Sequence, residues 1–242
     1  MAEVDAIVEL KGVRYSWPGT THPVLNINEL TLGKGERVFL YGPSGSGKST
    51  LLSIIAAVLK PQSGTVRVGG VDLCSLAGAA TDRFRADHIG LIFQQFNLLP
   101  FLSVLENVQL PCRFSSVRRG RAIEKGNSLE QEATRLLRAM QLPENLHASR
   151  SAMHLSVGQQ QRVAVARALM GRPSLVIADE PTSSLDTDAR DAFLQLLFTE
   201  LADTGASLLF VSHDESLRSR FDRSLALTDM NSADKAGTSE QS

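Results

Sequence analysis

The sequence predicts an α/β fold with an antiparallel β-subdomain at its N-terminus and an all-helical subdomain inserted into the core. Three observations support this prediction. Apolar and polar residues alternate with a period of two through the first forty residues, which is typical of strands. Helical periodicity replaces the alternation from Ser103 to about Gly171. A strand, a helix and a second strand then follow Gly171, which indicates a return to an α/β core.

Turn residues divide the N-terminal region into short predicted strands. Pro18-Gly19 and Gly33-Lys34-Gly35 are the punctuating turns. Strands are expected at Ile7–Leu10, Val13–Tyr15, Val24–Ile27 and Arg37–Tyr41. After them we expect a helix, a hairpin and a buried strand, which cover Lys48–Leu59, Gly64–Leu73 and His88–Phe93 respectively.

The middle and the end of the chain complete the predicted layout. Ser103 and Glu106 have the spacing of a capping box at a helix start, whereas the basic stretch Arg113–Lys125 is expected to be a surface loop. Gly205 suits the left-handed position that ends a helix. Around it we expect strands at Leu175–Ala178 and Ala206–Ser212 and a helix at Asp188–Ala202. The sequence thus predicts one domain over residues 1–228, with the helical insertion at about 100–170, and a polar, flexible tail over 229–242.

The composition excludes several classes of protein. With 43% hydrophobic residues, the chain can bury a sizeable core, so wholesale disorder is excluded. The 25 Lys and Arg residues balance 26 Asp and Glu residues, and aromatic residues make up 5%, so neither a basic footprint nor a stacking platform for nucleic acid is expected. The longest apolar run, Leu51–Leu59, is too short to span a bilayer, and the start of the chain does not resemble a secretory signal. Cys74 and Cys112 lie far apart in sequence, which favours reduced thiols in the cytosol.

The strongest motif is the glycine-rich segment Gly42–Thr50. It fits the pattern G-x-x-x-x-G-K-[ST], follows a predicted strand and opens a predicted helix. Glycines are required because backbone N–H groups must approach phosphate oxygens closely, and the positive end of the helix favours an anion. Lys48 is expected to reach the β- and γ-phosphates, and Ser49 to bind Mg²⁺. The α/β core is therefore predicted to be a P-loop NTPase core that binds a nucleotide.

A predicted strand that ends in two carboxylates supplies the second motif. The apolar segment Leu175–Ala178 leads directly into Asp179 and Glu180. Asp179 matches the acidic residue that accompanies a phosphate loop and holds Mg²⁺. Glu180 is placed where a carboxylate could polarise an attacking water. Alone, such a segment is usually a strand entering an exposed turn, and only the pairing with the phosphate loop makes it specific.

A second phosphate seat is predicted at Leu155–Arg162. Ser156 can cap the helix that follows, and the free N–H groups of Val157 and Gly158 can bind an anion. An ordinary helix cap is the simpler interpretation of this segment alone. A chain with one phosphate loop has little use for a second seat unless that seat serves the nucleotide of a neighbouring chain.

The ordered set of motifs resembles the ATP-binding subunits of ABC transporters. The set comprises the phosphate loop, Gln94, Leu155–Gln159, Asp179-Glu180, Ser183–Asp186 and Val211–Asp214, and the resemblance covers about Glu3 to Leu227. The segments Phe93-Gln94, Asn97–Pro100 and Glu106–Val108 resemble the MacB/LolD branch, which comprises macrolide-efflux and lipoprotein-release proteins.

This resemblance implies a role for each matching residue. Glu180 would be the general base, and His213, Gln94 and Lys48 would act beside it on the γ-phosphate. Ser49, Gln94 and Asp179 would contact Mg²⁺, and Trp17 would stack on adenine, with Tyr15 as its rival. ATP contacts are implied for Trp17, Gly42, Pro43, Ser44, Gly45, Ser46, Gly47, Lys48, Ser49, Thr50, Gln94, Ser156, Gly158, Gln159, Asp179, Asp186 and His213, of which Asp186 would contact the opposite subunit.

The chain departs from the family pattern at one position. The family signature is usually Leu-Ser-Gly-Gly-Gln, and Val157 occupies the place of the first glycine. The two γ-phosphate contacts that the signature makes come from the serine hydroxyl and the second glycine amide, and both are kept as Ser156 and Gly158. The departure therefore bears on the tuning of the site and not on its existence.

The resemblance also implies partners and a location. It implies a homodimer around two ATP molecules, an integral membrane permease and, through the permease, a periplasmic or accessory protein, at the cytoplasmic face of the cell membrane. No nucleic acid partner is expected. The segment Gln94–Phe101 is expected to receive a short helix of the permease, because it offers Phe96, Leu98, Leu99 and Phe101. Two alternatives remain open: a regulatory ATPase of the cell-division type and a soluble ATPase of iron–sulfur assembly.

Overall fold

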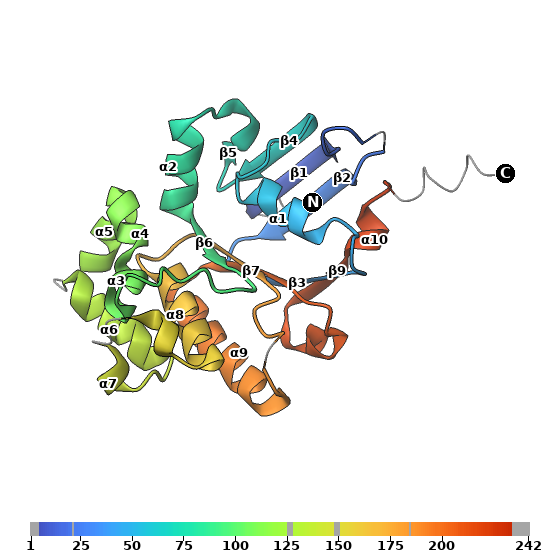
Figure 1. Cartoon of the computed structure of the whole chain (residues 1–242). Coiled ribbons are helices and arrows are strands. Elements are labelled where there is room, and N and C mark those ends of the chain that lie inside the picture. Colours follow the sequence, from blue (N-terminus) through green and yellow to red (C-terminus); the bar gives the residue numbers. More distant parts are fainter. Residues whose placement is uncertain (1–4, 21, 125–127, 148–150, 184, 234–242) are drawn as a thin grey trace. The chain divides into compact units, whose positions relative to one another are not determined.

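The computed structural model describes residues 5–20, 22–124, 128–147, 151–183 and 185–233 of the chain (Figure 1). The chain divides into two units. The first unit comprises Met1–Arg85 and Ser207–Ser242, and the second comprises Ala86–Ala206. The sequence predicts one domain with an insertion at about residues 100–170, so the second unit is wider than that insertion and includes the strands on both sides of it.

An antiparallel sheet of four strands forms the N-terminal part of the first unit. The strands are β1 (Ala6–Tyr15), β2 (Leu25–Gly33), β4 (Ser63–Val68) and β5 (Val71–Asp72), in the order β2-β1-β4-β5. Leu10 faces Leu30 on one side and Val66 on the other, so the apolar positions of three strands lie in register. Gly69 and Gly70 join β4 to β5 with φ angles of 57° and 80°, which fits a two-residue hairpin turn and confirms the predicted hairpin.

Three parallel strands complete the sheets of the first unit. Strand β3 (Arg37–Tyr41) lies between β8 (Ser207–Val211) and β9 (Arg223–Ala226). Phe39 of β3 packs against Phe210 and Phe221, with ring centroids 6.2 Å and 5.2 Å away. These aromatic contacts are worth roughly 0.5–1.5 kcal/mol each beyond their buried area.

The helix after the phosphate loop is shorter than the sequence pattern predicts. Helix α1 spans Lys48–Ile55, and the chain leaves the helix at Ala57, which has a φ of 56°. The predicted end at Leu59 was therefore too late, because a left-handed residue stops the helix before Pro61 takes effect. A short 3-10 helix, η1 (Leu73–Ser75), is capped by Asp72, and α2 spans Ala79–His88.

The second unit pairs two parallel strands with a set of helices. Strands β6 (Ile89–Ile92) and β7 (Leu175–Asp179) pair from Ile89 with Leu175 to Ile92 with Ala178. The helical insertion is confirmed in the described residues, and the capping box of Ser103 and Glu106 is present. Its elements are α3 (Val104–Gln109), α4 (Pro111–Phe114), α5 (Ser116–Ile123), α6 (Leu129–Ala139), α7 (Glu144–His147), η2 (Ala152–His154) and α8 (Val157–Leu169), and α9 (Thr187–Thr204) follows β7.

The prediction of a surface loop over Arg113–Lys125 was wrong for the described residues 113–124. Helices α4 and α5 cover most of this stretch, and Arg118 is buried. Its guanidinium donates to the backbone carbonyls of Met170 at 2.7 Å, Ala168 at 2.6 Å and Ile89 at 3.3 Å. The first two carbonyls belong to the C-terminal end of α8, where a positive charge is favoured. Burial lowers the pKa of Arg118 to about 10.

The C-terminal residues are ordered further than the sequence predicts. After η3 (Glu215–Arg220) and β9, helix α10 spans Leu227–Met230, so the tail expected from Asp229 does not begin there. Asn231 is buried and forms an isolated bridge with Ile27. Its side chain explains the order, because it accepts from the Asn26 N–H at 2.8 Å and donates to the Val24 carbonyl at 2.8 Å.

Among the described residues, no helix is long and apolar enough to cross a membrane.

The buried position of Arg118 leads to a stability prediction. Arg118→Leu leaves three buried carbonyls without their donor and should lower the free energy of unfolding by roughly 2–4 kcal/mol. Urea denaturation followed by circular dichroism measures this change. Arg119→Leu is the control, because Arg119 is exposed and its loss should change stability by less than about 0.5 kcal/mol. Equal midpoints for the two variants would contradict the structural role of Arg118.

Candidate nucleotide-binding and catalytic site

The phosphate loop joins β3 to α1 in the first unit, and its backbone requires glycine. Gly45 and Gly47 have φ angles of 81° and 97°, in the left-handed region that other residues avoid. A Cβ on Gly47 would lie 2.9 Å from Leu25 Cδ2 and 3.2 Å from the Val24 carbonyl oxygen. Conformation and space therefore both select glycine at this position.

The side chains and N–H groups of the loop suit an anionic ligand. Lys48 Nζ donates to the carbonyls of Gly42 at 2.7 Å and Pro43 at 2.9 Å, which holds the ammonium over the loop. Ser46 Oγ is buried and has no hydrogen-bond partner among the described residues. Gly47 caps α1 without a side chain, so the first-turn N–H groups of α1 have no side-chain cap. A cation, an orphaned hydroxyl and a helix N-terminus together fit the phosphates of a nucleotide.

His213 leaves the parallel sheet of the first unit at the same edge as the phosphate loop. Leu40 pairs with Val211, and the Ser212 N–H donates to the Leu40 carbonyl at 3.3 Å. Strand β3 ends at Tyr41 and continues into Gly42 of the phosphate loop. Strand β8 ends at Val211 and continues through Ser212 into the exposed His213. The register thus brings the predicted γ-phosphate ligand to the end of the strand beside the loop.

The two aromatic candidates for adenine stacking differ in exposure. Trp17 is 44% exposed, whereas Tyr15 is buried in β1. Their rings meet edge to face, with centroids 5.2 Å apart. Trp17 is therefore the more accessible of the two rings for stacking, with Tyr15 packed against it.

The second unit brings together Gln94 and the two carboxylates. Ile92 pairs with Ala178 in the parallel register of β6 and β7. Gln94 follows Ile92 by two residues, and Glu180 follows Ala178 by two, so both leave the same edge of this strand pair. Gln94 is exposed, and Glu180 has a φ of 48°, a conformation that costs a non-glycine residue free energy. Such strain is found where the surroundings hold a functional side chain in place.

The predicted second phosphate seat is the N-terminus of α8. Ser156 caps the helix: its Oγ accepts from the Gln159 N–H at 3.3 Å, and its own N–H donates to Gln159 Oε1 at 2.9 Å. The N–H groups of Val157 and Gly158 belong to the first turn, which a helix leaves without internal partners. A Cβ on Gly158 would meet nothing within 4 Å, so the space beside this turn is open.

Asp186, predicted to contact an opposite subunit, has a local role in the chain itself. Its carboxylate accepts from the Ala189 N–H at 2.8 Å and caps α9. This bond uses one oxygen of an exposed side chain. Ser184, part of the same motif, lies outside the described residues.

The donors at the predicted magnesium ligands suit that ion. Ser49 offers a hydroxyl and Asp179 a carboxylate, and both are oxygen ligands of the kind that Mg²⁺ prefers. Among the described residues no group of three or more His, Cys, Asp or Glu side chains could hold a metal. Magnesium is commonly bound through one or two protein ligands and the phosphates of the substrate, so a cage of that kind is not required.

Comparison with known proteins decides the family. The family model described as ABC transporter matches residues 25–183. The chain belongs to the ABC transporter family. It is an ATP-binding protein and an ATPase of that family.

Relatives of similar sequence place this ABC ATPase beside LolD and MacB, and a solved ABC cassette has a similar fold. The lipoprotein-releasing system ATP-binding protein LolD of Anaeromyxobacter dehalogenans is 46% identical over 225 residues, which cover 92% of this chain and 90% of LolD. The macrolide export ATP-binding/permease protein MacB of Rhodopirellula baltica is 37% identical over 225 residues, but the match covers only 32% of MacB. The dimeric post-hydrolysis structure of the cassette MJ0796, bound to ADP and Pi, superposes with a TM-score of 0.78 at 34% identity and covers 90% of this chain and 93% of that one.

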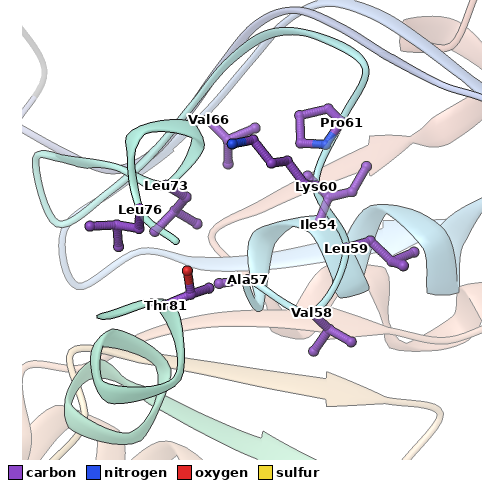
Figure 2. Close-up of a pocket in the computed structure, with 10 residues that line it drawn as sticks. All are labelled: Ile54, Ala57, Val58, Leu59, Lys60, Pro61, Val66, Leu73, Leu76 and Thr81. Atoms are coloured by element: carbon purple, nitrogen blue, oxygen red, sulfur yellow. The ribbon is translucent and has the colours of Figure 1, made fainter. Parts of the chain in front are cut away.

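A small apolar pocket in the first unit of the ABC ATPase is separate from the nucleotide motifs. It lies between the end of α1, strand β4 and the start of α2, and Ile54, Val66, Leu73 and Leu76 are among its lining residues (Figure 2). Its volume of about 90 Å³ is far below the several hundred Å³ typical of ligand sites. None of the predicted site residues lines it.

The sequence analysis missed Asn231 as a support of the phosphate loop. Besides its bonds to Asn26 and Val24, the Asn231 amide donates to the Ser46 carbonyl at 3.3 Å. A polar residue in a polar C-terminal stretch gives no signal of this kind, because the contact spans 185 residues of sequence. The only available signal was the apolar Leu225–Leu227 segment just before it, which favours a further buried element.

The geometry of Lys48 leads to a prediction for the ABC ATPase. Lys48→Ala should abolish measurable ATP turnover and weaken ATP binding, because it removes the only charged side chain of the loop, while circular dichroism stays unchanged. Phosphate release and a fluorescent nucleotide titration measure the two effects. Lys60→Ala is the matched control, since Lys60 is an exposed lysine of the same unit and should leave both values unchanged. Wild-type turnover in Lys48→Ala would contradict the assignment of the loop.

Proposed function

We propose that this ABC ATPase works as a homodimer around two ATP molecules and drives a separate membrane permease, in export or mechanotransmission of the MacB/LolD type. The observation that carries the proposal is the second phosphate seat. One chain has a glycine-rich phosphate loop in its first unit and a capped, open helix N-terminus at Ser156 and Gly158 in its second. We infer that each chain uses Ser156 and Gly158 to bind the phosphates of the nucleotide held by its partner chain.

Two relatives support the choice of system. LolD is named for a lipoprotein-releasing system and MacB for macrolide export. The match covers 90% of LolD, which is named as an ATP-binding protein, and 32% of MacB, whose name combines ATP-binding and permease parts. The permease would hold the ATPase at the cytoplasmic face of the membrane and could connect it to a periplasmic or accessory protein.

Hydrolysis would rely on position and charge more than on covalent chemistry. Lys48, with the N–H groups of the phosphate loop, would hold the β- and γ-phosphates and neutralise the developing charge. Glu180 would accept a proton from the attacking water, and His213 would bond the γ-phosphate. Ser49, Gln94 and Asp179 would contact bound Mg²⁺, and the ion would supply charge neutralisation on the phosphates.

The proposed shared site predicts a trapped dimer. Glu180→Gln removes the base but keeps the shape, and loss of a general base typically costs about 10²–10⁴ in rate, so ATP should be bound and not hydrolysed. Trapped ATP should then hold two chains together, and the variant should shift from monomer to dimer when ATP and Mg²⁺ are added. Sedimentation velocity measures the shift.

A second substitution tests whether the seat causes that shift. Ser156→Arg in the Glu180→Gln background places bulk at the seat and should cancel dimer formation while nucleotide titration still shows ATP bound to the phosphate loop. A Glu180→Gln variant that stays monomeric at saturating ATP, alone and with its permease present, would overturn the shared site.

The structure modifies the predicted docking segment for the permease. Phe101 is 76% exposed, but Phe96, which was expected to share in the contact, is buried. The loop that carries Phe101 is fixed by the buried Asn107, which accepts from the Leu99 N–H at 2.8 Å and donates to the carbonyls of Leu99 and Leu102. Phe101 is therefore an apolar side chain held out on a rigid loop, which suits a partner contact.

Phe101→Glu should release the subunit from its permease without lowering its affinity for ATP. Co-purification from detergent-solubilised membranes, together with a nucleotide titration, measures both. Phe114→Glu is the comparison, because Phe114 is 73% exposed and lies in the basic stretch Arg113–Lys125, which is the alternative docking site if the segment Gln94–Phe101 does not bind the permease. If Phe114→Glu releases the permease and Phe101→Glu does not, the docking site lies on α4 and α5.

A further inference from the structure

Helix α8 of the second unit carries two buried polar side chains that reach out of the helix. Seven of its thirteen residues, from Val163 to Leu169, are buried without interruption, so α8 is enclosed by the rest of the unit. Gln161, 1% exposed, and Arg167, 9% exposed, are the buried long polar side chains of this helix. Buried polar groups of this kind require partners, and their partners define what the helix holds.

Arg167 holds the turn that follows Gln94. Its guanidinium donates to the carbonyls of Phe96 at 2.5 Å and Asn97 at 2.6 Å. Both of these residues are in the left-handed region, with φ angles of 56° and 49°. Two adjacent non-glycine residues in this conformation need support from outside the turn, and the planar fork of an arginine suits two neighbouring acceptors. Burial of the guanidinium lowers the pKa of Arg167.

Gln161 holds the turn that follows Glu180. Its Nε2 donates to the carbonyl of Pro181, the residue directly after Glu180. Glu180 is again left-handed, with a φ of 48°. The other end of the amide, Gln161 Oε1, is buried and has no hydrogen-bond partner among the described residues. A buried acceptor without a partner costs folding free energy. The free Oε1 can therefore accept a hydrogen bond from an N–H group when the neighbouring turn moves.

We propose that α8 is a mechanical link between the phosphate seat at its N-terminus and the two catalytic turns of its own chain, with Gln161 and Arg167 as positioning residues. The link rests on the proposed shared site. A nucleotide of the partner chain that binds at Ser156 and Gly158 moves or fixes α8, and α8 sets the positions of Glu180 and Gln94. Each chain thereby activates its own catalytic residues when its seat is filled.

The dimensions and stiffness of a helix suit this role. From the seat to Arg167 the helix rises by about 15 Å at 1.5 Å per residue, and a buried helix moves as one body. The three hydrogen bonds that Gln161 and Arg167 make to these turns are to backbone carbonyls and not to the catalytic side chains, so they fix where the turns lie without entering the chemistry.

The test compares conservative variants on one helix. Arg167→Lys keeps the charge but loses the planar fork, and Gln161→Met keeps the size but loses the amide. Both should lower turnover per ATP-bound dimer by about 10- to 100-fold, the loss expected when a reacting group is misplaced by about an ångström. ATP affinity and the melting temperature should stay near wild type. Arg162→Lys is the matched control, because Arg162 of α8 donates to the Gln141 carbonyl and to neither turn.

Dimer formation is measured in parallel, with each variant combined with Glu180→Gln. The link is supported if each variant combined with Glu180→Gln forms the dimer normally with ATP, and the same variant with Glu180 intact hydrolyses ATP slowly. Turnover per dimer equal to that of Arg162→Lys would overturn it. So would a loss of turnover that merely follows a loss of ATP affinity or of melting temperature, since that is the pattern of a structural residue. If Glu180→Gln alone stays monomeric, the failure belongs to the proposed shared site, so the two failures are distinguishable.

Discussion

The ends of the parallel strands determine where every candidate catalytic residue of this ABC ATPase lies. Parallel strands in register finish at one edge, and residues that follow them enter turns at that edge. In the first unit the pairing of Leu40 with Val211 places the phosphate loop and His213 at such an edge, and in the second unit the pairing of Ile92 with Ala178 does the same for Gln94 and Glu180. The turns are tight, and their left-handed residues must be held by neighbouring groups.

Buried polar side chains supply much of that support, and they do so through backbone carbonyls. Helix ends and left-handed turns leave carbonyls that have no partner in the regular ladder. Arg118 donates to such carbonyls at the end of α8, and Arg167 does so at the turn after Gln94. Asn231 donates to a carbonyl of the phosphate loop. The cost is desolvation of the charge, and it appears as the lowered pKa of both arginines. Such a contact is specific in direction, so it fixes a turn where apolar packing alone would let it shift.

Local signals allowed much of the fold and the motifs to be predicted, whereas the long-range contacts escaped. The hairpin at Gly69-Gly70, the cap at Ser156 and the strand before Asp179 depend on residues adjacent in sequence, and the structure contains all three. Arg118 appeared as one more arginine in a basic stretch, because two of its partners lie 50 and 52 residues further along the chain and the third lies 29 residues before it. Phe96 looked as available as Phe101, because both are apolar residues of one short segment, but in the structure Phe96 is buried and Phe101 is exposed. The roles of the individual site residues remain predictions, carried by the motifs and consistent with where the structure places them.

The valine at position 157 departs from the family signature, but it does not change the groups at the start of α8 that are proposed to bind phosphate. In a helix N-terminus the ligand contacts come from the cap side chain and from backbone N–H groups, and neither depends on the side chain of the first helical residue. Ser156 and Gln159 form their reciprocal cap with Val157 between them, and the space beside Gly158 stays open. The Val157 side chain points instead to solvent, where it is 51% exposed. The valine therefore leaves the geometry of the proposed anion seat intact and adds an apolar surface beside it.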